Sequence, residues 1–251
     1  MTALPACFLT HPIAHRGLHD ASDGRPENSL AAFRAAIAAG YGIELDVQMS
    51  SDGAAMVFHD DHLDRLTNQS GPIAQRPAAD LSGIKLSGGH DTIADLKQVL
   101  ELIAGRVPLL VEVKDQDGTM GQDVGPLEAA VATALRPYPG PVAIMSFNPH
   151  SVSAFGEIQP DISLGLVTDR FEPEDWPGLN AERREHLGQI LDFDASGAGF
   201  ISHNQTQLDD LPVSALKAQG VPVLCWTVRS RDEERRARSI ADNVTFEGYL
   251  P

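Results

Sequence analysis

Carboxylate side chains interrupt two otherwise apolar segments of the sequence. Glu44 and Asp46 stand two residues apart in the first segment, and Glu112 stands two residues before Lys114 in the second. Residues two apart in a strand point to the same face, so each pair would share a face. Ionised carboxylates are rarely buried unless they are paired or bind a metal. Glu44, Asp46 and Glu112 together would offer an all-oxygen site that suits Mg²⁺ or Ca²⁺ better than Zn²⁺.

Both pairs could instead have a purely structural role. Glu44 and Asp46 could lie on a strand edge that faces solvent, where two like charges are well hydrated. Glu112 and Lys114 could simply neutralise each other as an ion pair.

Two histidines that end apolar segments are candidates for an acid–base pair. His15 and His59 each stand at the carboxyl end of such a segment. Imidazole titrates near pH ~6.5, so a histidine can accept or donate a proton close to neutrality. Arg16 follows His15, and its planar guanidinium suits a phosphate. Gly17 would let the chain turn closely over a ligand.

Two further side chains are weaker candidates for substrate contacts. Trp226 lies near the end of a late apolar segment and could form the floor of a pocket or pack in the core. His203 follows Ile201-Ser202 and could face the same mouth. The other histidines have no supporting pattern and are expected at the surface or in loops: His11, His19, His62, His90, His150 and His186.

The elements that must position these residues are short apolar segments, most of which end in a polar residue, as buried parallel strands do. We expect strands at Ile13–His15, Gly42–Val47, Ala55–His59, Pro108–Val113, Val142–Phe147, Ser163–Thr168, Gly199–Ser202, Val221–Val228 and Thr245–Leu250. Amphipathic stretches between them predict helices. The clearest are one that Asn28 or Ser29 caps and Gly40 ends, and one over Asp95–Ala104.

Alternating strands and helices predict an α/β fold with a parallel sheet and right-handed crossovers. We expect a distorted (β/α)₈ TIM barrel, since such barrels commonly fill roughly 250 residues as one domain. Nine strand candidates mean that one is either not a strand or lies outside the ring. The link from Asp46 to Ala55 is too short for a helix, so the second and third strands should be joined without one. Residues 60–89 are expected to form a loop-rich excursion near the active-site mouth, within a single domain spanning 1–251.

Composition and charge restrict the function further. Hydrophobic residues make up 42% and charged residues 22% of the 251 residues, as in ordinary globular proteins. The longest uninterrupted apolar run is too short to span a membrane, and the first residues do not resemble a signal peptide. A formal charge of −16 argues against a nucleic-acid or membrane-surface partner. Cys7 and Cys225 form no metal or redox spacing, which favours a cytoplasmic location.

The motifs and their order resemble those of the glycerophosphodiester phosphodiesterases over nearly the whole chain. The similar segments are Ala14-His15-Arg16-Gly17, Pro26-Glu27-Asn28-Ser29, Ile43-Glu44-Leu45-Asp46-Val47, Ser51-Asp52-Gly53, Val57-Phe58-His59-Asp60, Leu63-Asp64-Arg65-Leu66-Thr67, Val111-Glu112-Val113-Lys114 and Trp226-Thr227-Val228. This sequence departs from the family pattern in two places. Arg229 stands where the family usually has Asn, and Val244-Thr245-Phe246-Glu247-Gly248-Tyr249 stands where the family commonly has a Gly-Ile-Ile-Thr-Asp-type strand.

The resemblance implies a distorted (β/α)₈ barrel that uses one divalent cation to cleave a glycerophosphodiester into glycerol phosphate and an alcohol. By motif position, His15 and His59 would be the acid–base pair. The metal ligands would be Glu44, Asp46 and Glu112, with Mg²⁺ or Ca²⁺ expected and Mn²⁺ possible. Arg16 and Lys114 would contact phosphate or ligand. The reaction could pass through a cyclic phosphate or use direct attack by water.

Other functions remain open at this point. Within the family, a lysophospholipase-D-like activity on lipid phosphodiesters is the main alternative, and an exposed apolar patch beside the mouth would indicate it. A non-catalytic ligand-binding relative is a second. An amidohydrolase is a third, but it would need two histidines one residue apart on the first strand, which His15-Arg16-Gly17 lacks. The alcohol group and the oligomeric state are not encoded in these motifs.

Overall fold

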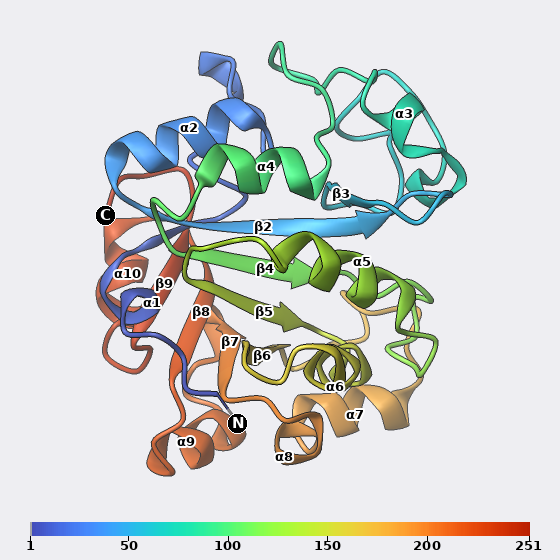
Figure 1. Ribbon diagram of the computed structural model, residues 1–251. Coiled ribbons are helices and arrows are strands. Elements are labelled where there is room, and N and C mark those ends of the chain that lie inside the picture. Colours follow the sequence, from blue (N-terminus) through green and yellow to red (C-terminus); the bar gives the residue numbers. More distant parts are fainter. Residues whose placement is uncertain (1) are drawn as a thin grey trace.

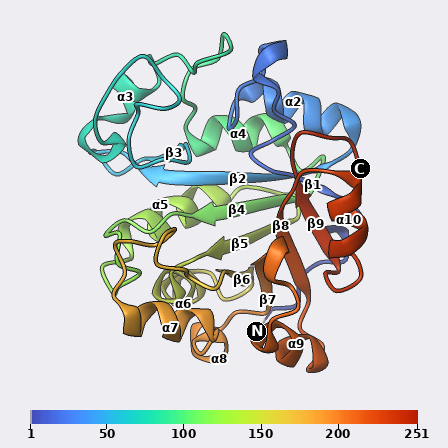
Figure 2. The same ribbon diagram turned by 180° about the vertical axis from the view of Figure 1, so that it is seen from behind.

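The parallel strands form a closed barrel. The computed structural model describes residues 2–251, and its nine-stranded sheet closes because β1 pairs with β2 on one side and β9 on the other. Figure 1 shows the near wall, and Figure 2 shows β7, β8 and β9 completing the far side. The predicted α/β barrel is thereby confirmed. The strands are β1 (Ile13–Ala14), β2 (Gly42–Met49), β3 (Ala55–Val57), β4 (Leu109–Val113), β5 (Val142–Ser146), β6 (Ser163–Thr168), β7 (Phe200–Asn204), β8 (Val223–Val228) and β9 (Asn243–Phe246).

The ninth strand candidate is β3, which lies outside the ring. It pairs antiparallel with the end of β2, with Val57 opposite Val47. The chain turns between them within a few residues, as the hydrogen bond from Ser50 N to Ala54 O shows. No helix joins β2 to β3, as expected. The ring continues from β2 directly to β4.

Helices cover the outside of the barrel where the amphipathic stretches predicted them. Ser29, rather than Asn28, caps α2, because its Oγ accepts a hydrogen bond from Ala32 N, and Gly40 ends the helix at φ 76°. The helices are α1 (Cys7–Thr10), α2 (Leu30–Ala39), α3 (Ala78–Leu81), α4 (Leu96–Ile103), α5 (Pro126–Leu135), α6 (Pro149–Ile158), α7 (Ala181–Gly188), α8 (Phe193–Ser196), α9 (Leu211–Ala218) and α10 (Arg231–Ala237). None of those in residues 2–251 combines the length and apolar composition needed to cross a bilayer.

Alternation along the strands separates two hydrophobic cores. Outward residues such as Leu45 and Val111 pack under the helices, whereas inward residues such as Leu110 fill the barrel. Phe8 of α1 belongs to the inner core, so the N-terminal segment packs against the barrel interior. Inside the barrel, Gly165 leaves room for Phe200, whose ring would lie 2.3 Å from a Cβ at that position. The inner core supports the floor on which the polar site is built.

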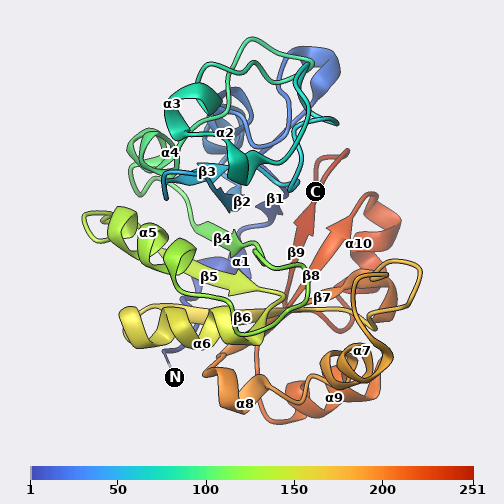
Figure 3. The same ribbon diagram turned by 90° about the vertical axis from the view of Figure 1, so that its right-hand side faces the viewer.

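Residues 60–89 follow β3 and form a loop-rich segment with the short helix α3 beyond the arrowhead of β2 (Figure 1). Apolar side chains of this segment, including Leu63 and Leu81, pack with Met56 and Phe58 into a small cluster of their own. The cluster fixes the segment against β3. Figure 3 looks onto this end of the barrel.

Candidate active site

A small cavity of about 140 Å³ opens where the barrel strands end. Active sites of TIM barrels lie at this carboxyl-terminal face. Seven of the nine site residues predicted from the sequence line the cavity: His15, Arg16, Glu44, His59, Glu112, Lys114 and Trp226. Asp46 is not part of the lining but is ion-paired with Lys114, which is, and His203 lies elsewhere.

The three predicted metal ligands form one buried cluster. Glu44 and Asp46 are each 1% exposed and Glu112 is 7% exposed. Asp46 on β2 is directly opposite Glu112 on β4, and carboxylate oxygens of all three residues lie within 4.8 Å of one another. The alternation of β2 places Glu44 and Asp46 inside the barrel, so the solvent-edge interpretation is wrong.

The charges of this cluster are not balanced by the protein alone. Burial, together with the negative charges of Asp46 and Glu112, raises the pKa of Glu44 well above its usual range. Burial also raises the pKa of Asp46, but Lys114, His59 and Arg16 outweigh it and hold that pKa below its usual range. Three crowded carboxylates of hard oxygen character fit a divalent cation, which would remove the repulsion that Glu44 experiences.

Two cations of the chain already contact the cluster. Lys114 Nζ lies 2.7 Å from Asp46 Oδ1 and 2.5 Å from Glu112 Oε1. Arg16 donates its backbone N–H to Glu44 Oε2 at 2.8 Å, and its Nε lies 3.4 Å from Asp46 Oδ2. Lys114 is therefore an ion-pair partner of Glu112, as the alternative interpretation held, and it also lines the cavity.

The backbone after β1 is shaped to bring Arg16 to the carboxylates. Arg16 has φ 54° and Gly17 φ 79°, both in the left-handed region. A Cβ at Gly17 would lie 2.9 Å from the ring of Phe33 and 3.0 Å from Cβ of Ala32 in α2. Glycine therefore allows both the turn and the close approach to the helix.

The imidazole of His59 is hydrogen-bonded to the carboxylate of Asp60, which in turn binds Arg65. Its Nδ1 donates to Asp60 Oδ1 at 2.6 Å. Arg65 from the 60–89 segment binds both oxygens of Asp60 at 2.7 Å, and it also binds both oxygens of Glu27. Glu27 accepts a hydrogen bond from Arg16 Nη1 at 2.6 Å. The 60–89 segment thus connects His59 to the arginine at the cavity.

His15 lines the same cavity and is more enclosed than His59. The side chain of His15 is 12% exposed and that of His59 is 32% exposed. Burial lowers the pKa of His15 to about 4, although its hydrogen bond with Glu247 acts in the opposite direction. A neutral imidazole at neutral pH is the form that can accept a proton.

Two aromatic side chains belong to the lining of the cavity. Trp226 and Phe147 both line it, with their rings edge to face at a centroid distance of 5.5 Å. Trp226 Nε1 donates to the Ser202 carbonyl at 2.9 Å, which fixes the indole. Trp226 is therefore both packed and exposed to the cavity, so the two interpretations of this residue hold together.

Comparison with known proteins identifies the family. The Glycerophosphoryl diester phosphodiesterase family profile matches residues 15–242, a range that includes every site residue predicted above. The chain belongs to this family. A glycerophosphodiester phosphodiesterase from Caldanaerobacter subterraneus subsp. tengcongensis is 32% identical over 244 residues, which cover 92% of this chain and 91% of that protein. The protein is thus a phosphoric diester hydrolase.

Solved structures of other phosphodiesterases have the same architecture. A phosphodiesterase from Oleispira antarctica, solved in complex with the product sn-glycerol-3-phosphate, superposes with a TM-score of 0.77 and is 25% identical, covering 96% of this chain and 94% of that one. A glycerophosphodiester phosphodiesterase from Thermotoga maritima has a TM-score of 0.69 at 21% identity, covering 93% and 92%. The latter likeness shows the fold.

The prediction that His203 faces the mouth of the phosphodiesterase site is wrong. The expected strand ended at Ser202, but β7 continues to Asn204, so alternation places His203 on the outer face with Ile201. Its Nδ1 lies 2.8 Å from the Thr168 hydroxyl, and burial lowers its pKa to about 4. His203 is 1% exposed and is not among the residues that line the cavity.

Several residues of the phosphodiesterase site were not predicted in their roles. Asn28 donates to Asp46 Oδ2 at 2.8 Å, although the sequence indicated only a helix cap there. Glu247 contacts His15, and His19, expected at the surface or in a loop, lies 3.4 Å from Glu247. Glu247 directly follows β9, which ends at Phe246, but the expected strand Thr245–Leu250 contained it. The strand-end signal that selected His15 and His59 was therefore hidden by the wrong strand boundary.

Proposed function

We propose that this phosphodiesterase hydrolyses glycerophosphodiesters to glycerol phosphate and an alcohol, with His15 and His59 as the acid–base pair. Glu44, Asp46 and Glu112 would hold one divalent cation, Mg²⁺ or Ca²⁺. The observation that carries the proposal is a single cavity lined by two histidines, two cationic side chains and carboxylates of this acidic cluster. Cleavage of a phosphodiester requires all three kinds of group: histidines that transfer protons, cationic side chains that bind the phosphate, and carboxylates that hold a metal ion.

The proposed reaction requires two proton transfers. One histidine removes the proton from a glycerol hydroxyl, whose oxygen attacks phosphorus, while the other protonates the departing alcohol. Water then opens the resulting cyclic phosphate, and the histidines exchange roles. Arg16 and Lys114 orient the anionic phosphate. A bound divalent cation would supply charge neutralisation and polarisation of a phosphoryl oxygen.

The distribution of exposed apolar side chains supports a small water-soluble substrate. Among residues 2–251, the large apolar side chains that are exposed are Ile158, Leu191, Leu211 and Leu250. None of them is among the residues that line the cavity, so they do not provide the exposed apolar patch beside the mouth that a lysolipid would favour. The acidic surface and two cysteines without a disulfide support a cytoplasmic enzyme.

Hydrolysis of a substrate panel tests this proposal. The panel contains glycerophosphocholine, glycerophosphoethanolamine, glycerophosphoglycerol and one lysophospholipid, each with Mg²⁺, Ca²⁺ or Mn²⁺. We expect turnover of the soluble diesters to exceed that of the lysolipid, with glycerol phosphate as the product in ³¹P NMR. Preference for the lysolipid would support the lipid-directed activity instead. Binding without turnover in every arm would support a ligand-binding relative.

The route through a cyclic phosphate has its own signature. A transient cyclic phosphate should appear in ³¹P NMR, and a substrate lacking the attacking glycerol hydroxyl should not be cleaved. Undiminished cleavage of that deoxy substrate would support direct attack by water.

The substitution Lys114→Met is expected to lower kcat/KM by 10²–10³-fold, roughly the loss from removing one charge-stabilising group. With metal bound, the cation compensates Asp46 and Glu112, so the melting temperature should remain nearly unchanged. Both quantities are measured on the same metal-loaded protein. A large loss of stability with near-normal turnover would make Lys114 a purely structural ion-pair partner.

The substitution Lys217→Met provides a matched control. Lys217 in α9 also pairs with a carboxylate, with Nζ 2.8 Å from Asp242 Oδ1, but it is partly exposed and outside the cavity. Exposed pairs contribute at most about 1 kcal/mol. We therefore expect activity and melting temperature close to those of the unsubstituted enzyme.

A further inference from the structure

Three strands that are neighbours in the barrel are each followed by a residue, and the side chain of one of these residues contacts the other two. β8, β9 and β1 are neighbours in the ring, and the residues directly after them are Arg229, Glu247 and His15. Backbone hydrogen bonds fix this alignment, from Glu247 N to Val228 O at 3.0 Å and from His15 N to Phe246 O at 2.9 Å. The pairing of these strands therefore brings the three side chains together.

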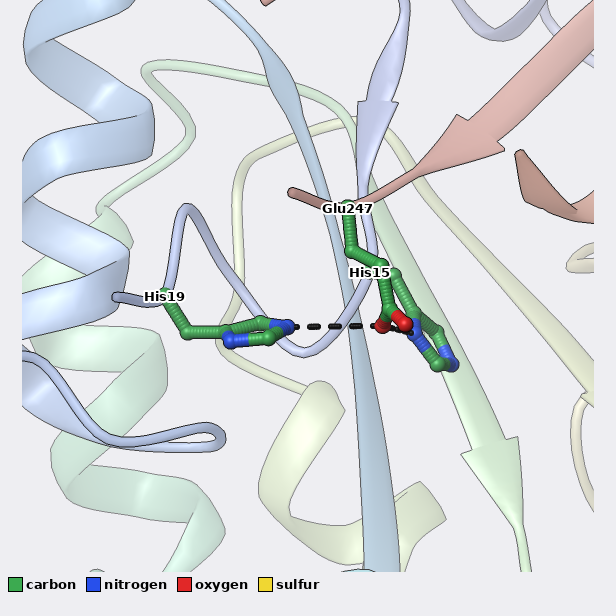
Figure 4. Close-up of side chains that lie close together, drawn as sticks. All are labelled: His15, His19 and Glu247. Atoms are coloured by element: carbon green, nitrogen blue, oxygen red, sulfur yellow. Dashed lines mark hydrogen bonds and ion pairs between the residues drawn. The ribbon is translucent and has the colours of Figure 1, made fainter. Parts of the chain in front are cut away.

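The side chain of Glu247 bridges the other two. Its Oε2 lies 2.6 Å from His15 Nδ1, and its Oε1 accepts a hydrogen bond from Arg229 Nε at 2.8 Å. Figure 4 shows the carboxylate between His15 and His19, with the second ring nitrogen of His15 directed away from Glu247. His19 Nε2 is farther from the carboxylate, at 3.4 Å. The short contacts are those to His15 and Arg229.

We propose that Glu247 is the positioning residue of His15, and that Arg229 fixes Glu247 in place. An ionised carboxylate can only accept hydrogen bonds, so the contact with Glu247 requires the proton of neutral His15 to be on Nδ1. Nε2 then carries the lone pair that takes part in proton transfer at the cavity. The relevance of this to turnover rests on the proposed role of His15, but the tautomer itself does not.

The charge state of Glu247 agrees with this assignment. Burial raises its pKa, but hydrogen bonds from His15 and His19 and the charge of Arg229 outweigh burial and hold the pKa well below its usual range. Glu247 is thus an anion at neutral pH. Arg229 is 60% exposed, so its ion pair contributes little to stability, and its effect should be on the orientation of Glu247.

A metal ion is the competing occupant of this cluster. Ligand atoms of His15, His19 and Glu247 lie within 4.8 Å of one another. However, Arg229 already occupies Oε1 of Glu247, and its positive charge opposes a second cation there. The contacts of His15 and Arg229 satisfy the carboxylate without a metal, so the cluster is better explained as a device that orients His15.

The same arrangement occurs at the second histidine. His59 donates through Nδ1 to Asp60, which Arg65 binds through both oxygens. Both histidines would thus present Nε2 for proton transfer. Arg229 and Glu247, which hold His15, both lie where the sequence departs from the family pattern, and they bind each other.

Nitrogen-15 NMR of the metal-loaded protein tests the tautomer without substrate. Histidine is labelled with ¹⁵N, Mg²⁺ is bound, and the resonances of His15 are assigned by their loss in a His15→Gln variant. We expect neutral His15 to be protonated on Nδ1 in the unsubstituted enzyme. In Glu247→Gln, the amide can donate to Nδ1, so the population with the proton on Nε2 should increase. Protonation of His15 on Nε2 in the unsubstituted enzyme would overturn the proposal.

Kinetics distinguish positioning from a structural role. Glu247→Gln is expected to lower kcat by at least about 10²-fold with KM changed only a few-fold, because an imidazole in the wrong tautomer is a poor proton acceptor. Glu247→Asp retains the charge and should recover at least about tenfold of this loss. Equal loss in both variants, accompanied by unfolding in melting curves, would indicate a structural role and overturn the proposal.

A double substitution tests whether Arg229 acts through Glu247. Arg229→Gln should lower kcat in the unsubstituted enzyme but have little further effect in Glu247→Gln, since coupled residues are non-additive. An equal effect in both backgrounds would overturn this coupling and indicate direct contact between Arg229 and substrate.

The control is Glu234→Gln, a glutamate in α10 that pairs with Arg238 outside the cavity. It should leave kcat and the His15 tautomer unchanged.

A His15→Ala enzyme with near-normal turnover would contradict the proposed function, whereas an unaltered tautomer in Glu247→Gln would contradict the positioning role. The two failures are therefore distinguishable.

Discussion

Removal of divalent cations by a chelator is expected to abolish hydrolysis, and Mg²⁺ or Ca²⁺ is expected to restore it. The reason is the cluster of Glu44, Asp46 and Glu112, whose carboxylates are buried together inside the barrel. Lys114 and Arg16 do not balance them, and Arg16 is shared with Glu27. Oxygen ligands of this kind prefer hard divalent cations. Full activity in excess chelator would contradict the proposed metal site.

The variant Asp46→Asn tests the same site through the protein. It removes a ligand charge while it retains the shape that contacts Asn28 and Lys114. We expect at least about a 10³-fold loss of kcat/KM, because metal-assisted charge stabilisation is worth several kcal/mol. Calorimetric titration should show weaker binding of Ca²⁺.

Asp242→Asn is the matched control for this substitution. Asp242 is also an acceptor paired with a lysine, but it precedes β9 at the opposite end of the barrel. Its substitution should leave both metal binding and kcat/KM within a few-fold of the unsubstituted enzyme. Equal loss of metal affinity in both variants would indicate a general effect on folding rather than a ligand role for Asp46.

Substitution of either histidine is expected to cause the second largest loss. His15→Ala and His59→Ala should each lower kcat by at least about 10²-fold, the usual contribution of a general acid or base. The plot of kcat/KM against pH should be bell-shaped for the unsubstituted enzyme, with two apparent pKa values that belong to the coupled pair. Each alanine variant should lose one limb of this profile.

His186→Asn is the control for the histidine variants. His186 in α7 also binds a carboxylate, with Nε2 2.9 Å from Asp192 Oδ1, but it is 38% exposed and lies outside the cavity. We expect an unchanged rate and pH profile. A His59→Ala enzyme within a few-fold of normal activity would exclude His59 from the acid–base pair.

The local sequence was sufficient for most of the barrel and for the centre of the site. Alternation around Glu44 and Asp46 predicted their common face, and β2 confirms it by placing both inside the barrel. Seven of the nine predicted site residues line one cavity, and Asp46 is ion-paired with one of them, Lys114. For the residues of the ring strands this worked because parallel strands place their carboxyl ends at the same face. His59 reaches the cavity by another route, because antiparallel β3 brings the chain back along β2 to Asp46, whose carbonyl accepts a hydrogen bond from Phe58 N.

The sequence predicted the ends of the strands less accurately than the presence of the strands. β7 extends two residues beyond the expected end, and this reverses the direction predicted for His203. β3 was recognisable as a strand, but only its pairing with β2 showed that it runs antiparallel outside the ring. A shift of one residue moves a side chain to the opposite face, and pairing with a neighbouring strand decides that shift.

Tertiary structure alone decided which carboxylate contacts His15, whereas the partner of His59 is the next residue, Asp60. Glu247 is 232 residues from His15 along the chain, yet the two lie in hydrogen-bond contact because β9 pairs with β1 when the barrel closes. Arg65 lies close to Asp60 in the chain, but its contact with Glu27, 38 residues away, depends on how the 60–89 segment packs on its apolar cluster. The sequence by itself determined which residues could do the chemistry, since residue type and strand periodicity are local properties. Their protonation and orientation were decided by the closure of the barrel, because partners distant along the chain meet only through strand pairing and packing.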